Sequence, residues 1–295
     1  MTYTQAVVLA LVQGLTEFLP ISSSAHLVLV PYLFGWPDQG LGFDVATNTG
    51  TLLAVIVYLR RELAAVTVAG LRSLTSGARG SGSPEDAGTG AADEDSGGGA
   101  VAGRPRLPPE ARLAWGIVLA TVPVAVAGLL ARDWVASAGR DPRIIAATSI
   151  GFGLLLWWAD RAGARRRELD SVRLSDAAFV GLAQALAIIP GTSRSGVTIT
   201  AGLARGFTRE EAARFSFLLY VPVGVLAAGL ELWELAGEGV PVAAIGPTLV
   251  GFAVAAGSAY LAIGALLAWV RRQSLTVFVV YRVALGLVIL AVLYL

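Results

Sequence analysis

Cysteine and lysine are both absent from this chain of 295 residues, and it contains a single histidine. Without cysteine, disulfides, thiolate metal sites and cysteine nucleophiles are excluded. Without lysine, a phosphate-binding P-loop is excluded, because that motif requires one. One histidine cannot make a zinc site here without cysteine, so an oxygen-preferring cation such as Mg²⁺ or Ca²⁺ is the plausible metal. Charge is also scarce, since only 15% of the residues are Asp, Glu, Lys or Arg.

Apolar residues take the place of charge, and 55% of the chain is hydrophobic. Uncharged runs long enough to span a bilayer recur along it, which predicts an all-α polytopic integral membrane protein with one membrane domain over residues 1–295. The first segment has no Lys or Arg before Arg60 and no small-residue cleavage site, so we expect it to be retained. The predicted transmembrane helices are 41–59, 113–131, 144–159, 213–233, 243–270 and 275–295.

Two further apolar stretches are interrupted by polar residues. Residues 1–33 carry Glu17, Pro20 and three serines, and residues 174–206 carry the segment PGTSRSG. A backbone break at membrane depth is tolerated only where it is buried in protein or lines a wet cavity, as in a re-entrant helical hairpin. We therefore expect two re-entrant hairpins in addition to the six transmembrane helices.

The arginines support this arrangement. With both hairpins re-entrant, 17 arginines fall on one face and three on the other, whereas a single crossing of the second stretch would give 12 against 8. Because cytoplasmic loops retain positive charge, we expect residues 60–112 and 160–173 inside and both termini outside. Residues 76–110 are Gly-rich and acidic, which predicts a disordered cytoplasmic loop. A dispensable insertion is the simpler interpretation of this loop, and a regulatory element is the alternative.

The two interrupted stretches resemble each other. LVQGLTEFLPISSSAHL aligns with LAQALAIIPGTSRSGVT, and nine residues separate both Gln13 from Ser22 and Gln184 from Ser193. Three predicted spans follow each hairpin, and because three is odd, the second half is inverted relative to the first. The sequence thus predicts an inverted-topology repeat of residues 1–159 and 172–295, with a site where the broken helices meet.

Arg194 is the strongest clue to the chemistry. A guanidinium inside an apolar segment is costly without an anionic partner, and its fork suits phosphate oxygens. Hydroxyls around it are potential donors, and two glycines would let backbone N–H groups approach an anion. The predicted substrate-binding set is Gly191, Thr192, Ser193, Arg194, Ser195 and Thr198. A purely structural bridge from Arg194 to Glu17 is the alternative.

Glu17, His26 and the serines beside them could supply the reactive groups. A carboxylate at this depth should be metal-bound, paired with arginine or acting as a base. An imidazole beside a serine is a recurrent means of activating a hydroxyl or a water, although a lone histidine is often a packed bystander. Together the two hairpins indicate phosphoryl chemistry on a lipid.

QGLTEFLPISSSAHL and PGTSRSGVT resemble the two signature motifs of the undecaprenyl-diphosphate phosphatase family, also called the bacitracin-resistance family. The similarity extends over nearly the whole chain, except the acidic loop. It implies removal of the terminal phosphate from a polyprenyl diphosphate, which recycles a lipid carrier for cell-envelope glycan synthesis. It also implies an inner-membrane site facing outside, a divalent cation, and catalytic roles for Glu17, Ser23, His26 and Arg194.

Some positions depart from the family pattern. Many relatives have Glu where this chain has Gln13, and an amide oxygen can ligate a cation but adds no charge. We therefore expect Glu17 to hold the cation with Gln13 assisting. Asn48 is expected to serve in helix packing, and Asp44 is a weak candidate for the metal.

The predicted mechanism uses Arg194 to hold the diphosphate and His26 as a base that delivers either the Ser23 hydroxyl or a water to the terminal phosphorus. The sequence leaves these two nucleophiles open. A transporter or flippase of polyprenyl phosphate is the alternative function, because broken helices in inverted repeats also build transporters. The expected partners are the polyprenyl diphosphate lipid and the membrane, and no nucleic acid is expected. Two copies of the chain could also form a homodimer.

Overall fold

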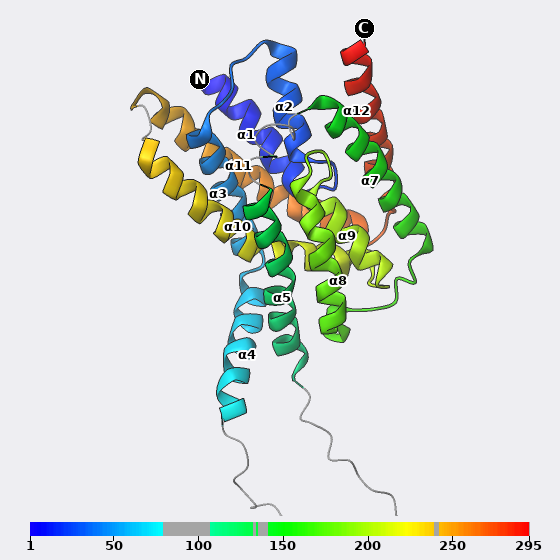
Figure 1. The fold of residues 1–295 in the computed structure, drawn as a ribbon. Coiled ribbons are helices and arrows are strands. Elements are labelled where there is room, and N and C mark those ends of the chain that lie inside the picture. Colours follow the sequence, from blue (N-terminus) through cyan, green and yellow to red (C-terminus); the bar gives the residue numbers. More distant parts are fainter. Residues whose placement is uncertain (79–106, 132–133, 135–140, 239–241, 295) are drawn as a thin grey trace, which may run out of the picture.

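The structure is a computed structural model that describes residues 1–78, 107–131, 134, 141–238 and 242–294. All regular structure in these residues is helical, which confirms the all-α class. The helices form one elongated body, and α1 (Tyr3–Phe18) begins at the same end at which α12 (Thr276–Tyr294) finishes (Figure 1).

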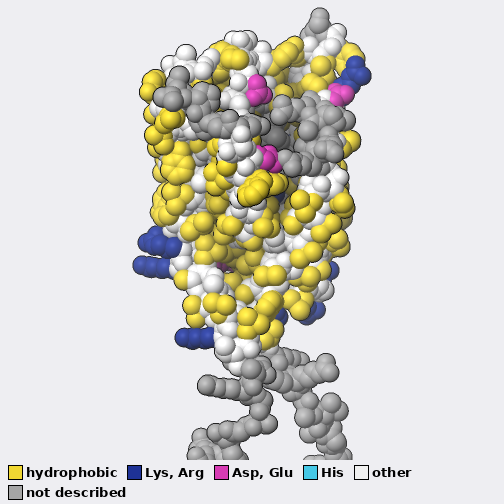
Figure 2. All heavy atoms as spheres, turned by 60° about the vertical axis from the view of Figure 1, so that its left-hand side comes forward, with side chains coloured by type: hydrophobic (Ala, Val, Ile, Leu, Met, Phe, Trp, Pro, Cys, Tyr) yellow, Lys and Arg dark blue, Asp and Glu magenta, His cyan; other side chains and the backbone are white. Residues whose placement is uncertain are grey.

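Six of the helices are long and apolar enough to cross a membrane, as the sequence predicts. They are α3 (Leu41–Tyr58), α5 (Pro109–Leu130), α7 (Pro142–Ala162), α10 (Arg209–Glu238), α11 (Val242–Val270) and α12. Many of their large apolar side chains face outward, among them Leu130 and Trp233, which agrees with a lipid-facing surface. Figure 2 shows hydrophobic side chains over most of this face, with most of the visible arginines toward its lower end.

Each of the two interrupted stretches forms a pair of short helices that meet at a break. The first pair is α1 and α2 (Ser23–Phe34), and the second is α8 (Leu174–Ala185), extended by a 3₁₀ turn (η3, Leu186–Ile188), and α9 (Arg194–Ala204). At each break a serine at the N-cap position of the following helix adopts a positive φ, 72° at Ser22 and 67° at Ser193. The Ser193 side chain caps its helix by accepting a hydrogen bond from the Gly196 amide. Non-glycine residues rarely adopt this conformation, and strained residues gather at functional sites.

Helix packing follows an exchanged pattern between the halves of the chain. α1 packs against α11, whereas α8 packs against α5, and α7 packs against α12. By order along the chain α1 corresponds to α8, and α5 corresponds to α11. A two-fold relation between the halves would produce this exchange, and it brings the two breaks together in the middle of the molecule.

The prediction of a disordered loop over residues 76–110 is wrong at both ends, where the structure is helical. A further helix, α4 (Arg60–Ala78), follows α3 and includes residues 76–78, and α5 already begins at Pro109. Proline at the first position and Glu110 in the first turn favour a helix start there, which the Gly-rich composition obscured. The prediction of disorder for residues 79–106 lies outside the described residues.

Candidate functional site

A cavity of about 520 Å³ opens beside the first break, and the polar residues that line it come from α1, α2, α3, α10 and the segment between α2 and α3. Its polar lining includes Gln13, Glu17, Ser23, Asn48 and Glu231. The lining also contains Asp38 and Asp44, so the cavity is acidic.

Glu17 lies in the last turn of α1 and connects the two hairpins. Its Oε2 accepts a hydrogen bond from Ser23 Oγ at 2.7 Å, and its Oε1 lies 3.3 Å from a guanidinium nitrogen of Arg194. Both side chains of this ion pair are mostly buried, so the pair is weakly screened by solvent. The predicted bridge between Glu17 and Arg194 thus exists in this structure.

Arg194 is the first residue of α9, and aromatic rings hold its guanidinium in place. The guanidinium lies 4.2 Å from the ring centroid of Tyr220 and 5.8 Å from that of Phe18, and it donates to the Ser216 carbonyl at 3.1 Å. Tyr220 in turn shares a hydrogen bond with Thr51. A guanidinium fixed in this way next to a carboxylate can exchange that partner for a phosphate without a large conformational change.

The hydroxyls of the second hairpin, predicted to bind the substrate, are hydrogen-bonded within the protein in this structure. Ser195 Oγ donates to the Leu19 carbonyl at 3.0 Å, and Thr198 Oγ1 donates to the Ser216 hydroxyl at 2.7 Å. Ser193 Oγ accepts from the Gly196 amide at the helix start. These contacts brace the breaks and the start of α9, so this part of the set positions Arg194 in this structure.

Two other members of that set differ from the rest. Thr192 Oγ1 is buried without a hydrogen-bond partner among the described residues. Gly191 has a φ of 84°, and a Cβ there would lie 2.5 Å from the Ile145 carbonyl. Glycine is therefore required at this tight turn, where no side chain has room.

His26 has partners other than Ser23. Its Nδ1 is hydrogen-bonded to the Ser22 carbonyl, and its Nε2 is hydrogen-bonded to the hydroxyl of Tyr281 on α12. The imidazole also stacks on the Tyr281 ring, with an interplanar angle of 7°. Both ring nitrogens are thus engaged, and the Ser23 hydroxyl donates its hydrogen bond to the Glu17 carboxylate instead.

Arg282, on α12, is a buried residue that sequence reasoning missed. Its guanidinium is fully buried, and among the described residues its hydrogen-bond partners are all backbone carbonyls. Two of these, Gly191 and Thr192 at 2.9 and 2.8 Å, belong to the second break, and Pro20 at 3.5 Å belongs to the first. An arginine inside an apolar span was the available signal, because such a residue is expensive unless it has a role.

Gln13 and Asn48 continue the polar lining toward α10. Gln13 Nε2 donates to Asn48 Oδ1 at 2.8 Å and to Glu17 at 3.3 Å, and the Asn48 amide donates to the Glu231 carboxylate at 3.4 Å. Asn48 therefore belongs to the cavity, whereas helix packing alone was expected of it. Glu231 was also missed, because its helix reads as an ordinary span.

The donors beside Glu17 fit an oxygen-preferring cation. Gln13 Oε1 is buried without a hydrogen-bond partner among the described residues, so it is available as a ligand. No group of three or more His, Cys, Asp or Glu side chains in the described part of the chain gathers closely enough for a metal. One carboxylate, that of Glu17, with the amide oxygen of Gln13 suits Mg²⁺, because proteins hold this ion by one or two carboxylates together with substrate phosphates.

Comparison with known proteins supplies a family. Residues 6–288 match the model of the family described as "Bacitracin resistance protein BacA". A protein of Magnetococcus marinus named undecaprenyl-diphosphatase is 49% identical over 288 residues, which cover 98% of each chain. Proteins of the same name from Thioalkalivibrio sulfidiphilus and Moorella thermoacetica are 46% and 45% identical, over 96% and 100% of this chain and 96% and 99% of their own.

Proposed function

Since this chain belongs to the bacitracin resistance protein BacA family, we propose that it is an undecaprenyl-diphosphatase, which hydrolyses undecaprenyl diphosphate to the monophosphate and inorganic phosphate. The single observation that best supports this activity is the position of Glu17, which contacts Ser23 on one side and Arg194 on the other. A hydroxyl that can act as nucleophile, a carboxylate that can act as base and a guanidinium that can bind phosphate thus come together from two segments far apart in the sequence.

The chemical step follows from these contacts. The Ser23 hydroxyl gives its proton to Glu17 while Oγ forms a bond to the terminal phosphorus. The bond from that phosphorus to the bridging oxygen breaks, and the polyprenyl monophosphate leaves. Water then cleaves the phosphoserine and releases inorganic phosphate, with the Glu17 carboxyl group returning the proton to Ser23. Direct attack by a water that Glu17 activates is the alternative.

Positive charge supports the same step. The Arg194 guanidinium stabilises the charge that spreads over the transferred phosphoryl group, and Ser216 with the two aromatic rings keeps it in position. Arg282 donates to carbonyls of both breaks and to no carboxylate in the part of the chain that the structure describes, so its charge also favours an anion near the breaks.

A divalent cation would be held by oxygens of Glu17 and Gln13. When bound, it would neutralise charge on the diphosphate. His26 has a positioning role in this scheme, because its ring connects the first break to Tyr281 on α12.

The chain is a multi-pass membrane protein. We place it in the inner membrane with the cavity facing outside, which the concentration of arginines at the opposite end supports. The transporter alternative is not favoured, because the matched relatives bear the name of a hydrolase.

Phosphate release from a prenyl diphosphate by detergent-purified protein tests the activity. We expect Ser23→Ala and Glu17→Gln each to reduce kcat by about 10³-fold or more, given the usual contributions of nucleophile and base. Ser24→Ala is the matched control, because Ser24 lines the same cavity and hydrogen-bonds only to Ser22 among the described residues. Its kcat should remain near that of the wild type.

Acid quenching during turnover of a diphosphate labelled at its terminal phosphate separates the two nucleophiles. A labelled phosphoserine at Ser23 is the expected result. If full single-turnover release occurs without labelled protein, water is the nucleophile. If no folded preparation releases phosphate, the hydrolase assignment itself is wrong.

A further inference from the structure

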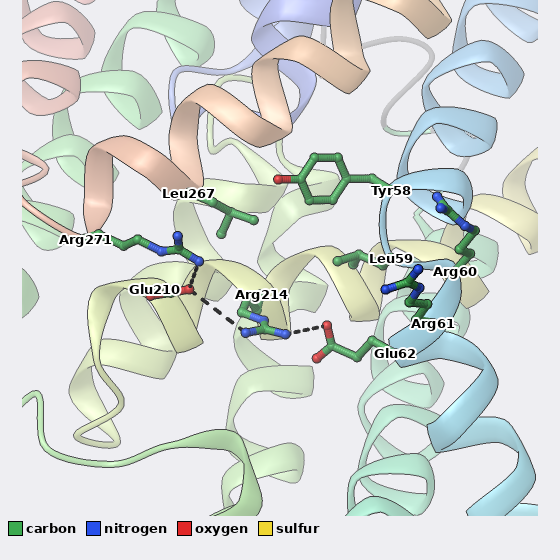
Figure 3. A pocket seen from close by; sticks show the side chains of 9 residues that line it. All are labelled: Tyr58, Leu59, Arg60, Arg61, Glu62, Glu210, Arg214, Leu267 and Arg271. Atoms are coloured by element: carbon green, nitrogen blue, oxygen red, sulfur yellow. Dashed lines mark hydrogen bonds and ion pairs between the residues drawn. The ribbon is translucent and has the colours of Figure 1, made fainter.

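A second hollow, of about 420 Å³, lies at the arginine-rich end of the molecule, where α3 and α4 meet α10 and α11. We call it the arginine pocket. Its lining includes Tyr58, Arg60, Arg61, Arg214, Leu267 and Arg271. Figure 3 shows that these side chains come from separate helices. The arginine pocket shares no lining residue with the Glu17 cavity, and its volume is in the range of small-molecule sites.

Two of its four arginines are neutralised by carboxylates. Arg271 pairs with Glu210 at 2.6 Å, and Arg214 pairs with Glu62 at 2.9 Å (Figure 3). These ion pairs connect α4, α10 and the end of α11, so they hold the walls of the arginine pocket together.

The other two arginines have no such partner. Arg60 donates to the Val57 carbonyl at 3.0 Å, and within the described residues neither Arg60 nor Arg61 forms an ion pair. The lining therefore keeps an excess of positive charge of about two guanidinium groups, both on the same side of the pocket. Guanidinium groups in this arrangement suit phosphate oxygens.

Exposed apolar side chains lie on the helices that line the arginine pocket, and the Tyr260 ring packs against that of Tyr58, with centroids 5.2 Å apart. Val57 on α3 is 40% exposed, and on α11 Tyr260 and Leu261 are 42% and 70% exposed. These residues lie within about three turns of the pocket along their helices, where the surface faces lipid. A charged pocket that leads onto lipid-facing apolar side chains has the layout of a site for an amphipathic anion.

We propose that the arginine pocket binds the phosphate of an anionic membrane phospholipid, with the acyl chains along α3 and α11. Arg60 and Arg61 contact the phosphate oxygens, and the Tyr58 hydroxyl is a further donor in the lining. Because Glu62 and Glu210 repel a second negative charge, the pocket favours a singly charged phosphodiester over a phosphate dianion. This proposal does not depend on the proposed enzymatic activity.

Native mass spectrometry of the full chain in a neutral detergent tests it, with phosphatidylglycerol as the probe and phosphatidylcholine as the uncharged comparison. We expect phosphatidylglycerol to bind more tightly, and Arg60→Gln/Arg61→Gln to weaken its binding by roughly 25-fold, at about fivefold per arginine. Arg60→Lys/Arg61→Lys keeps the charge and should retain most of the affinity.

Arg165→Gln/Arg166→Gln is the matched control, because it removes two neighbouring exposed arginines that do not line the arginine pocket. Its affinity for phosphatidylglycerol should equal that of the wild type. An equal loss in the two Gln variants would overturn the proposal, since it would show a general effect of surface charge. Complete displacement of the lipid by excess inorganic phosphate would also overturn it, because the ligand would then be free phosphate.

Discussion

Glu17 receives more of the polar contacts in the cavity than any neighbouring side chain, since Gln13, Ser23 and Arg194 all reach its two oxygens. These contacts fix the carboxylate at the break, where both the Ser23 hydroxyl and the Arg194 guanidinium reach it. Gln13 differs from the others because its amide oxygen Oε1 has no hydrogen-bond partner among the described residues. The position is therefore suited to a test of the cation.

Gln13→Glu replaces the amide group by a carboxylate, so the amide nitrogen that donates to Glu17 and Asn48 becomes a second oxygen. We expect the cation concentration for half-maximal phosphate release to fall by about tenfold, because a second negative charge attracts the cation more strongly. A titration with Mg²⁺ after treatment with EDTA measures it. Gln39→Glu, in the same cavity but without a contact to Glu17, is the control. An unchanged titration in Gln13→Glu would show that Gln13 is not a ligand.

Arg282 is the second residue whose replacement is informative. In Arg282→Met the carbonyls of both breaks lose their donor, and each buried unsatisfied group costs about 1–3 kcal/mol. We expect a lower Tm in detergent and a fall in kcat of at least about tenfold, whereas Arg282→Lys should recover part of both. Thermal unfolding and phosphate release measure the two effects.

Arg272→Met is the control for this replacement, because Arg272 is exposed beyond the end of α11. It should leave both Tm and kcat unchanged. Full activity and an unchanged Tm in Arg282→Met would contradict a positioning role for Arg282.

At the scale of elements, the two hairpins depend on close helix contacts. Gly14 on α1 faces α11 so closely that a Cβ would lie 2.6 Å from the Ala255 carbonyl and would collide with the Ser258 hydroxyl. The contact brings α1, and with it Glu17, against the body of the protein. Small residues at such contacts are typical of helix packing in membranes, where close backbone approach supplies the attraction.

Gly14→Ala should therefore move α1 away from α11. We expect a loss of stability of about 1–3 kcal/mol, the usual cost of overpacking, together with lower kcat because Glu17 shifts relative to Arg194. Gly128→Ala on α5 is the control, since a Cβ there meets nothing within 4 Å. Unfolding in detergent and phosphate release should both be impaired in Gly14→Ala and unchanged in Gly128→Ala. Equal stability and equal kcat in the two variants would argue against the close contact.

At the scale of the whole molecule, the absence of cysteine makes the topology directly testable, because any single cysteine introduced is the only reactive thiol. Tyr294→Cys, at the end of α12, should react with a membrane-impermeant maleimide in intact spheroplasts. Arg165→Cys should react only after permeabilisation, because arginine-rich segments remain in the cytoplasm. The reverse labelling pattern would invert the proposed orientation and place the Glu17 cavity inside.

The sequence by itself determined the membrane class, the six spans and the positions of the two breaks. These are local properties, because hydropathy over about 20 residues decides whether a helix can cross a bilayer. A proline or a run of serines shows where such a helix must stop. Glu17 and Arg194 could also be identified, since an ionisable residue in an apolar segment requires a partner.

Only the tertiary structure decided which groups meet. Glu17 and Arg194 are 177 positions apart, His26 and Tyr281 are 255 apart, and Arg282 reaches Pro20 across 262. The choice of Glu17 over His26 as the partner of Ser23, and the exchange of helices between the halves, depend on such long-range packing. No local pattern encodes these contacts, because they arise from how the two hairpins pack in three dimensions.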